Sequence, residues 1–109
     1  MLLIISADEY KEYYVNFITP VKNNILEDSL FSRLLYSTDI FTTTGLYLRN
    51  YSKDKLLEIE TDLLQSYRSS KTKVYSLTDH AANNSLLKIS GIWESNSSIG
   101  LAYKFSHLF

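Results

Sequence analysis

Asp79 and His80 form the adjacent carboxylate–histidine pair of this chain and could carry acid–base chemistry. A polar loop beside a sheet edge often holds a general base and the group that orients it. The loop from Thr78 to Ser85 is also rich in ordinary turn-forming residues, and adjacent side chains usually point in different directions. The pair therefore supports a small hydrolase or nuclease as a third hypothesis, with a simple turn as the competing interpretation.

Other catalytic and metal-binding patterns are missing from the sequence. The chain has no cysteine, which excludes disulfides, thiolate metal sites and thiol nucleophiles. Its two histidines come without patterned carboxylates, whereas a metal site needs three or four converging ligands. Neither a G-x-S-x-G motif nor a phosphate-binding glycine loop occurs. We therefore expect no metal and no cofactor, and we favour a function without catalysis.

A basic segment with interleaved aromatic residues follows the middle of the chain, and it consists of Tyr67, Arg68, Lys71, Lys73 and Tyr75. Proteins that bind single-stranded nucleic acid combine these residue types, because cations hold the phosphates and aromatic rings stack on the bases. Lysines near the C-terminus of a helix are also favoured by the helix dipole alone. A small nucleic-acid-binding domain is therefore the alternative function.

A stripe of apolar and aromatic residues near the start of the chain gives the clearest functional hint. It has helical spacing over residues 7–18 and consists of Tyr10, Tyr13, Tyr14, Phe17 and Ile18. Tyrosine is enriched where a protein meets another surface, although it also serves in the outer shell of small cores. We interpret Tyr13, Phe17 and Ile18 as the edge that packs on the core, and Tyr10 and Tyr14 as the edge that a partner contacts.

These observations favour a small non-catalytic protein–protein interaction module: an inhibitor, an immunity-type or adaptor protein, or an accessory subunit of a complex. The expected partner is another protein or a second copy of the chain. Nucleic acid is the less favoured partner, and we expect no contact with a membrane. The predicted partner-binding residues are Tyr10, Tyr13, Tyr14, Tyr47 and Tyr51.

Length and composition agree with one folded domain. The chain has 109 residues, 45% of them hydrophobic, which is typical of a globular protein. Eleven basic and twelve acidic residues leave a formal charge of −1, so no global field attracts nucleic acid or an anionic membrane. The apolar start Met-Leu-Leu-Ile-Ile is too short for the core of a signal peptide and lacks a basic flank. We expect a cytoplasmic protein.

The elements that must position these residues follow from the apolar pattern. Leu2 to Ile5 is continuously apolar and predicts a short buried strand. Ser6 and Glu9 form a capping box, which predicts a helix over residues 7–18. The single proline then interrupts the chain, and the apolar spacing predicts a second helix from about Val21 to Tyr36.

The middle of the chain predicts further strands and a helix. Asp39 to Asn50 is rich in β-branched and aromatic residues and indicates a long strand, or a bent pair of strands around Gly45. Ser52 begins another helix, which continues to about Tyr67 with one apolar face. Thr72 to Leu77 alternates and predicts a short strand.

Two alternating runs on either side of Ser95–Ser97 predict a C-terminal β-hairpin. A loop with an odd number of residues places the apolar residues of both strands on one face, namely Leu87, Ile89, Trp93, Ile99, Leu101, Tyr103 and Phe105. In one odd register Lys88 and Lys104 come close to opposite each other. Like charges in that arrangement repel mildly, and an acidic partner could relieve the repulsion.

Together these elements predict a single α+β domain over residues 1–109. Each predicted helix has one apolar side and the hairpin has one core face, which favours two packed layers. The expected architecture is a two-layer sandwich with two to three helices packed on one face of a mixed sheet of about five strands, ending in the C-terminal hairpin.

Overall fold

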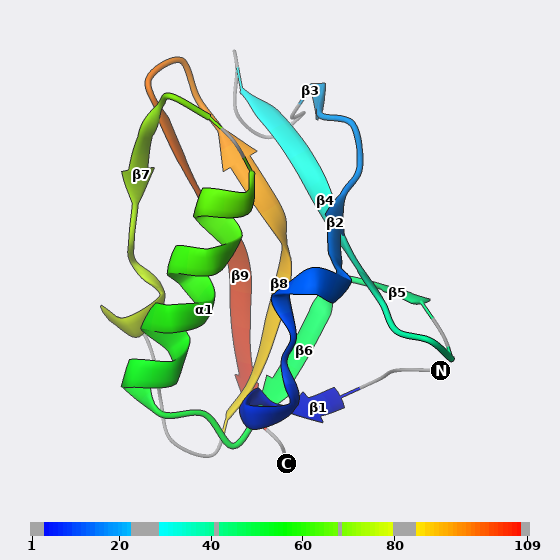
Figure 1. The fold of residues 1–109 in the computed structure, drawn as a ribbon. Helices are drawn as coiled ribbons and strands as arrows, with labels where there is room; N and C mark the ends of the chain where they lie inside the picture. Colours follow the sequence, from blue (N-terminus) through cyan, green and yellow to red (C-terminus); the bar gives the residue numbers. More distant parts are fainter. Residues whose placement is uncertain (1–3, 23–28, 41, 68, 80–84, 108–109) are drawn as a thin grey trace.

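The computed structural model describes residues 4–22, 29–40, 42–67, 69–79 and 85–107, and within them nine strands form one mixed sheet (Figure 1). The strands are β1 (Ile4–Ser6), β2 (Val15–Phe17), β3 (Val21–Lys22), β4 (Leu30–Ser37), β5 (Thr42–Thr44), β6 (Leu46–Arg49), β7 (Thr72–Val74), β8 (Ser85–Glu94) and β9 (Ser98–His107). The helical elements of these residues are α1 (Lys53–Ser66) and the one-turn 3₁₀ helices η1 (Ala7–Glu9), η2 (Glu12–Tyr14) and η3 (Leu77–Asp79).

The hairpin of β8 and β9 organises the sheet, because every other strand joins one of its two edges directly or through a neighbour. β6 pairs with the beginning of β8, and the first half of β4 pairs with the end of the same edge. The second half of β4 leaves β8 and pairs with β2 and β5 instead. β1 lies parallel to β6, and β7 lies parallel to β9.

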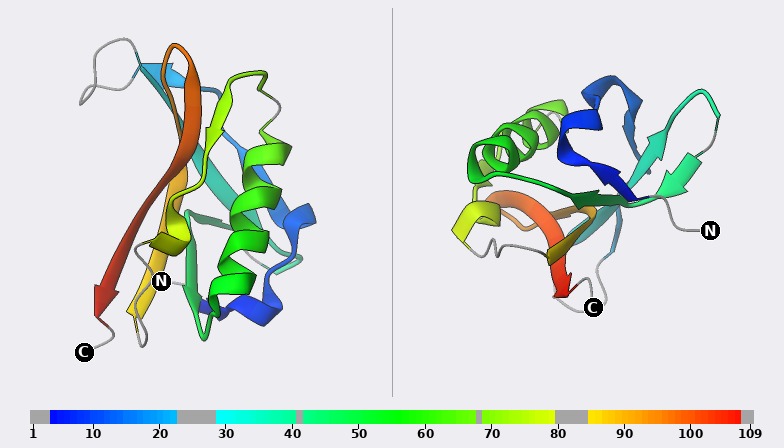
Figure 2. Two further views of the ribbon diagram at one scale, coloured as in Figure 1. Left: turned by 90° about the vertical axis from the view of Figure 1, so that its left-hand side faces the viewer. Right: turned by 90° about the horizontal axis from the view of Figure 1, so that it is seen from below.

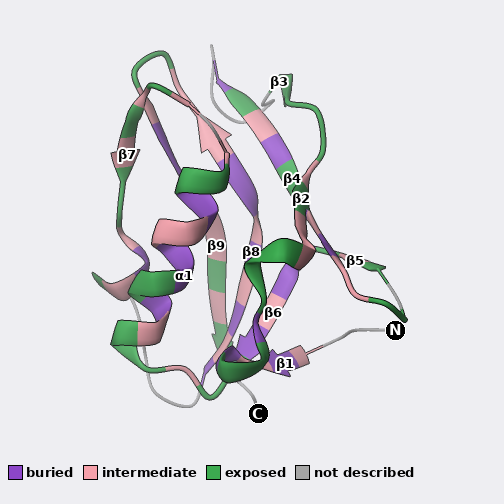
Figure 3. Cartoon of the chain, viewed as in Figure 1, coloured by how far each residue is buried: buried purple, intermediate pink, exposed green. Residues whose placement is uncertain are grey.

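The helix α1 packs on one face of the sheet, which we call the inner face (Figure 2). Buried residues gather between α1 and this face (Figure 3). Alternate strand residues point inward, as do Leu87 and Ile89 of β8, which are both 0% exposed. The helix contributes a stripe of fully buried side chains, which are Leu56, Ile59, Leu63 and Leu64.

The predicted helix over residues 7–18 is wrong, because this segment forms η1, η2 and β2. The expected Ser6–Glu9 contact does occur: the Ser6 backbone N–H donates to Oε1 of Glu9 at 2.9 Å. It stabilises only one 3₁₀ turn. The tyrosine, valine and phenylalanine residues that follow have modest helix propensity and fit a pleated strand well, which explains why the chain continues into β2.

The predicted helix from Val21 to Tyr36 is also wrong, because β3 and β4 occupy its described parts; residues 23–28 lie outside the described residues. The apolar residues of this segment fit two periods. In the strand, Ser32, Leu34 and Tyr36 alternate inward and are at most 2% exposed. The predicted fold class is therefore wrong: the described residues contain one α-helix, not two or three, on a sheet of nine strands, not about five.

Other predicted elements are confirmed. α1 begins after Ser52, whose Oγ accepts a hydrogen bond from the backbone N–H of Lys55 at 3.1 Å. Two strands, β5 and β6, meet at Gly45, whose φ of +87° is a conformation that favours glycine. A short strand begins at Thr72, although it ends at Val74.

The C-terminal hairpin forms, but its register changes at Ser90. From Ser85 to Ile89 it follows the predicted odd register, with Lys88 directly opposite Lys104. A bulge between Ile89 and Gly91 then shifts the pairing by one residue, so the positions nearest the loop pair in an even register. The shift turns Trp93 away from the inner face, contrary to the prediction.

Gly91 allows β4 to approach β8 beside this bulge. A Cβ atom added at Gly91 would lie 2.0 Å from the backbone oxygen of Ser32, which is far inside contact distance. A side chain at this position would therefore separate the two strands.

Candidate functional site

The first part of the aromatic stripe lies on the η1–η2 segment, which runs beside α1 and in front of β6 (Figure 1), and the exposure of its residues differs from the prediction. Tyr10 is 6% exposed and belongs to the core, where its ring stacks 6.2 Å from that of Tyr36. Its buried hydroxyl has no hydrogen-bond partner among the described residues. Tyr13 is 72% exposed. The expected assignment of Tyr10 to the surface and Tyr13 to the core is therefore reversed.

A chain of aromatic contacts supports the exposed Tyr13 ring. Tyr13 meets Tyr14 edge-on at a centroid distance of 4.6 Å, and Tyr14 meets the buried Tyr36 at 5.7 Å. The backbone N–H of Lys11 donates to the Tyr36 hydroxyl at 3.0 Å, which fixes the segment that carries both rings. The edge-on contact with Tyr14 favours one orientation of the Tyr13 ring, which reduces the conformational entropy that this ring loses when another surface covers it.

Beside Tyr13 the surface is hollowed between the η1–η2 segment and α1. This hollow, which we call the tyrosine groove, has a volume of about 500 Å³. Its lining combines two tyrosines, two lysines and four carboxylates: Asp8, Tyr10, Lys11, Glu12, Tyr13, Lys55, Glu58 and Asp62. The carboxylates outnumber the lysines, so the groove carries net negative charge although the whole chain is nearly neutral.

The negative charge concentrates around Asp62 on α1. Burial raises the pKa of the Asp62 carboxyl, and the nearby carboxylates of Glu12 and Glu58 raise it further, while Lys55 lowers it. Lys55 forms an ion pair with Glu58 at 3.6 Å. Burial also raises the pKa of the Tyr10 hydroxyl, with Asp62 as the next cause. A cation placed in the groove would stabilise this excess of negative charge.

Three of the five predicted partner-binding tyrosines, Tyr14, Tyr47 and Tyr51, do not line the groove. Tyr47 lies on β6 with the Nζ of Lys88 5.5 Å from its ring centre. Tyr51 packs 6.1 Å from Phe105. Burial raises the pKa of its hydroxyl, and a hydrogen bond with Ser85 opposes that rise. The five predicted tyrosines therefore do not form one surface.

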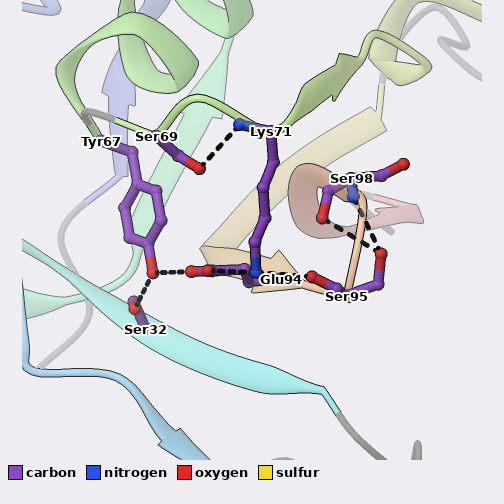
Figure 4. A network of polar contacts seen from close by, with 7 residues as sticks. All are labelled: Ser32, Tyr67, Ser69, Lys71, Glu94, Ser95 and Ser98. Atoms are coloured by element: carbon purple, nitrogen blue, oxygen red, sulfur yellow. Dashed lines mark hydrogen bonds and ion pairs between the residues drawn. The ribbon is translucent and has the colours of Figure 1, made fainter.

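Two residues of the predicted basic segment, Tyr67 and Lys71, belong to a polar network at the end of α1 (Figure 4). Lys71 donates from Nζ to Oε2 of Glu94 at 2.6 Å and to the Ser95 carbonyl at 2.7 Å. The Tyr67 hydroxyl donates to Oε1 of Glu94 at 2.8 Å and lies 2.7 Å from the Ser32 hydroxyl. The hydrogen bond from Lys71 holds the pKa of Glu94 below its ordinary value. The network joins the helix end to the hairpin.

The remaining predicted residues do not complete a site. Lys73 lies in β7 opposite Ile99, and Tyr75 is 43% exposed; neither belongs to the network. Arg68 and His80 lie outside the described residues, so the structure does not test the pairing of Asp79 with His80. Asp79 itself is exposed in η3.

Within the described ranges, no group of three or more His, Asp or Glu side chains is placed to hold a metal ion. In the same part of the chain no helix has the length and apolar character needed to cross a membrane.

The groove carboxylates are functional candidates that the sequence interpretation missed. Glu58 and Asp62 have a helical i, i+4 spacing that places like charges together on one face of α1, and this signal was available. No local pattern links them to Asp8 and Glu12, which reach the groove only because the N-terminal segment packs against the helix.

A comparison of the chain with models of known families, with curated proteins and with solved structures finds no match.

Proposed function

We propose that this chain is a non-catalytic protein–protein interaction module, and that its tyrosine groove holds a basic segment of the partner. The observation that carries this proposal is the 72% exposed Tyr13 at the rim of a hollow in which carboxylates outnumber lysines. Exposed tyrosine rings are typical anchors of interfaces, and a pre-ordered ring is a better anchor than a mobile one. An inhibitor, an adaptor or an accessory subunit would each use such a surface.

The chemistry of the groove favours a lysine or arginine side chain as the bound group. Its cation would lie among the carboxylates of Glu12, Glu58 and Asp62, and its aliphatic stem would pack against the Tyr13 ring. Charge complementarity of this kind gives specificity and accelerates association. The partner is another protein or a second copy of the chain.

Selection from a random peptide library tests the charge of the partner. We expect the wild-type protein to enrich peptides that carry lysine or arginine. The double variant Glu58→Gln/Asp62→Asn should lose this preference, because it removes two of the groove carboxylates. The double variant Lys53→Gln/Asp54→Asn is a control on the same helix, since neither residue lines the groove.

Enrichment of acidic or uncharged peptides by the wild-type protein would contradict the proposal. The same holds if Glu58→Gln/Asp62→Asn enriches basic peptides as strongly as the wild type does. Far-ultraviolet circular dichroism of each variant shows whether it has kept the fold.

A further inference from the structure

The face of the sheet opposite α1, which we call the outer face, carries a second arrangement of side chains. α1 covers the inner face only, and no described helix packs on the outer face (Figure 2). The relevant residues alternate with buried inward residues along β4, β6, β8 and β9. They are three aromatic residues and three cations: Phe31, Tyr47, Trp93, Arg33, Lys88 and Lys104.

Strand pairing brings these residues together in rows across the outer face. Phe31 is directly opposite Trp93. Tyr47 is opposite Lys88, which is opposite Lys104 in turn. Paired residues in neighbouring strands project from the same face, so aromatic rings and cations alternate over a continuous surface.

The cations of this surface lack anionic partners in the described part of the chain. None of Arg33, Lys88 and Lys104 forms an ion pair with a described carboxylate. The only acidic residue of β4, β6, β8 and β9 is Glu94, and its side chain is bound to Tyr67 and Lys71. The facing lysines repel each other, and an anionic ligand would relieve this repulsion.

A hollow of about 200 Å³ lies within the surface, lined by Arg33, Thr44, Gly45, Lys88 and Ser90. It lies where β4 separates from β8 and where the bulge at Ser90 interrupts the hairpin. A water molecule occupies about 30 Å³ in the liquid, so the hollow has room for a phosphate group and its hydration. Arg33 and Lys88 supply two cations to the hollow, and Thr44 and Ser90 supply two hydroxyl groups. Both kinds of group bind phosphate oxygens in proteins.

The aromatic rings flank the cations at close range. The guanidinium of Arg33 lies 5.9 Å from the ring centre of Phe31, and the Nζ of Lys88 lies 5.5 Å from that of Tyr47. The indole of Trp93 lies over Gly100, whose missing side chain leaves the space for it. Ring faces beside a phosphate-sized cationic hollow are the combination that binds unpaired bases together with their backbone.

We propose that the outer face binds single-stranded nucleic acid, with a backbone phosphate in the Arg33–Lys88 hollow and bases against Phe31 and Trp93. This site differs from the predicted segment around Lys71, and it does not depend on the tyrosine groove. A duplex is a poorer ligand, because its bases are already stacked and paired.

Trp93 is the only tryptophan of the chain, so its fluorescence reports directly on this surface. The assay titrates the whole protein with a single-stranded oligothymidine of about 12 nucleotides at several salt concentrations. We expect quenching of Trp93, with a logarithmic association constant that falls with a slope of about −2 against the logarithm of salt, since three cations contribute about −0.7 each. A duplex of the same length should bind more weakly.

Matched variants separate the two parts of the site. Arg33→Gln and Lys88→Gln should each weaken binding and reduce the magnitude of the slope by about 0.7, whereas Lys88→Arg should keep both. Phe31→Leu should weaken binding about tenfold without changing the slope, because it removes stacking only. Lys53→Gln on α1 removes one positive charge from the helix side and should change neither quantity.

Three results would overturn the proposal. One is the absence of Trp93 quenching at low salt by wild-type protein. Another is equal binding of inorganic polyphosphate and oligothymidine, which would assign the face to anions in general. The third is a salt-sensitive dimer, seen by light scattering, that involves Lys88 and does not bind the oligonucleotide; this would assign the face to a second copy of the chain. Circular dichroism of each variant identifies any that fails to fold.

Discussion

Glu60 is the fully buried carboxylate that joins α1 to η3. It is 0% exposed and accepts hydrogen bonds from the backbone N–H groups of Ser76 and Leu77, each at 3.1 Å to Oε2. Leu77 is itself fully buried, so its N–H group cannot turn to water when the acceptor is removed. The substitution Glu60→Ala therefore leaves a buried backbone donor without a partner.

The expected size of this effect follows from the two hydrogen bonds. A hydrogen bond to a charged group contributes about 1.5–3 kcal/mol, so two such bonds set a range of about 3–6 kcal/mol. Removal of the carboxylate also removes the cost of burying it, and we expect a net loss of about 3 kcal/mol in the free energy of unfolding. Glu60→Gln keeps one carbonyl acceptor and should lose about half as much.

The pH dependence of stability gives a second signature of Glu60. Burial raises the pKa of its carboxyl above the ordinary value of 4.5, although the hydrogen bonds from Ser76 and Leu77 oppose this. The folded state therefore binds the proton more tightly than the unfolded state does. The resulting stabilisation is complete below pH 4.5 and is lost as the pH rises through the folded-state pKa. The stability of the wild-type protein should fall over this interval relative to Glu60→Gln.

Urea denaturation followed by circular dichroism measures both quantities at a series of pH values. Glu60→Ala would refute the reasoning if its free energy of unfolding stayed within about 0.5 kcal/mol of the wild-type value. A stability difference between wild type and Glu60→Gln that grows in favour of the wild type as the pH rises would refute the assigned direction of the pKa shift.

Three further substitutions test other features of the fold. Lys71 lowers the pKa of Glu94, so their ion pair stabilises the protein above pH 4.5, and this stabilisation is lost as the pH falls through the folded-state pKa of Glu94. Lys71→Met should cost about 1 kcal/mol in the free energy of unfolding at neutral pH. It should also weaken this acid dependence in denaturation experiments. Tyr10→Phe removes a buried hydroxyl without a described partner, so thermal melting should show unchanged stability or a gain of about 0.5–1 kcal/mol; a loss above about 1 kcal/mol would indicate a missed hydrogen bond. Gly91→Ala should cost about 2–3 kcal/mol in the same melts, because its Cβ would collide with the backbone of Ser32.

Local sequence patterns predict the elements that depend mainly on interactions between residues close together in the chain. The Ser52 cap and one apolar face predict α1, and the alternating runs predict β8 and β9. Residues 7–18 and 30–37 were misassigned because their apolar spacing fits a helix and a strand, and the choice depends on neighbouring strands that the spacing does not reveal. The local sequence does not predict the bulge at Ser90 either. It lies beside the close approach of β4 at Gly91, and β4 is distant in the sequence.

The candidate sites depend still more on long-range folding. Tyr13 stays a candidate, and its exposure differs from the expected core position because the segment forms a 3₁₀ turn and not the predicted helix. The carboxylates of the groove come from both the N-terminal segment and α1, which no spacing rule connects. The pairing of Lys88 with Lys104 was foreseen from the hairpin register. The contribution of Arg33 to the same face depends on β4, a segment whose apolar spacing predicts a helix.

The affinity of the tyrosine groove for a basic peptide, measured by calorimetry with and without the Tyr13 ring, tests the proposed function most directly. A peptide selected by the wild-type protein should bind Tyr13→Ala about tenfold more weakly, since an anchor residue contributes at least about 1–2 kcal/mol. Tyr13→Phe should bind nearly as well as the wild type, and so should Tyr75→Ala, which removes a tyrosine that is 43% exposed outside the groove. Equal affinity of Tyr13→Ala and wild type, with the fold intact, would contradict the account.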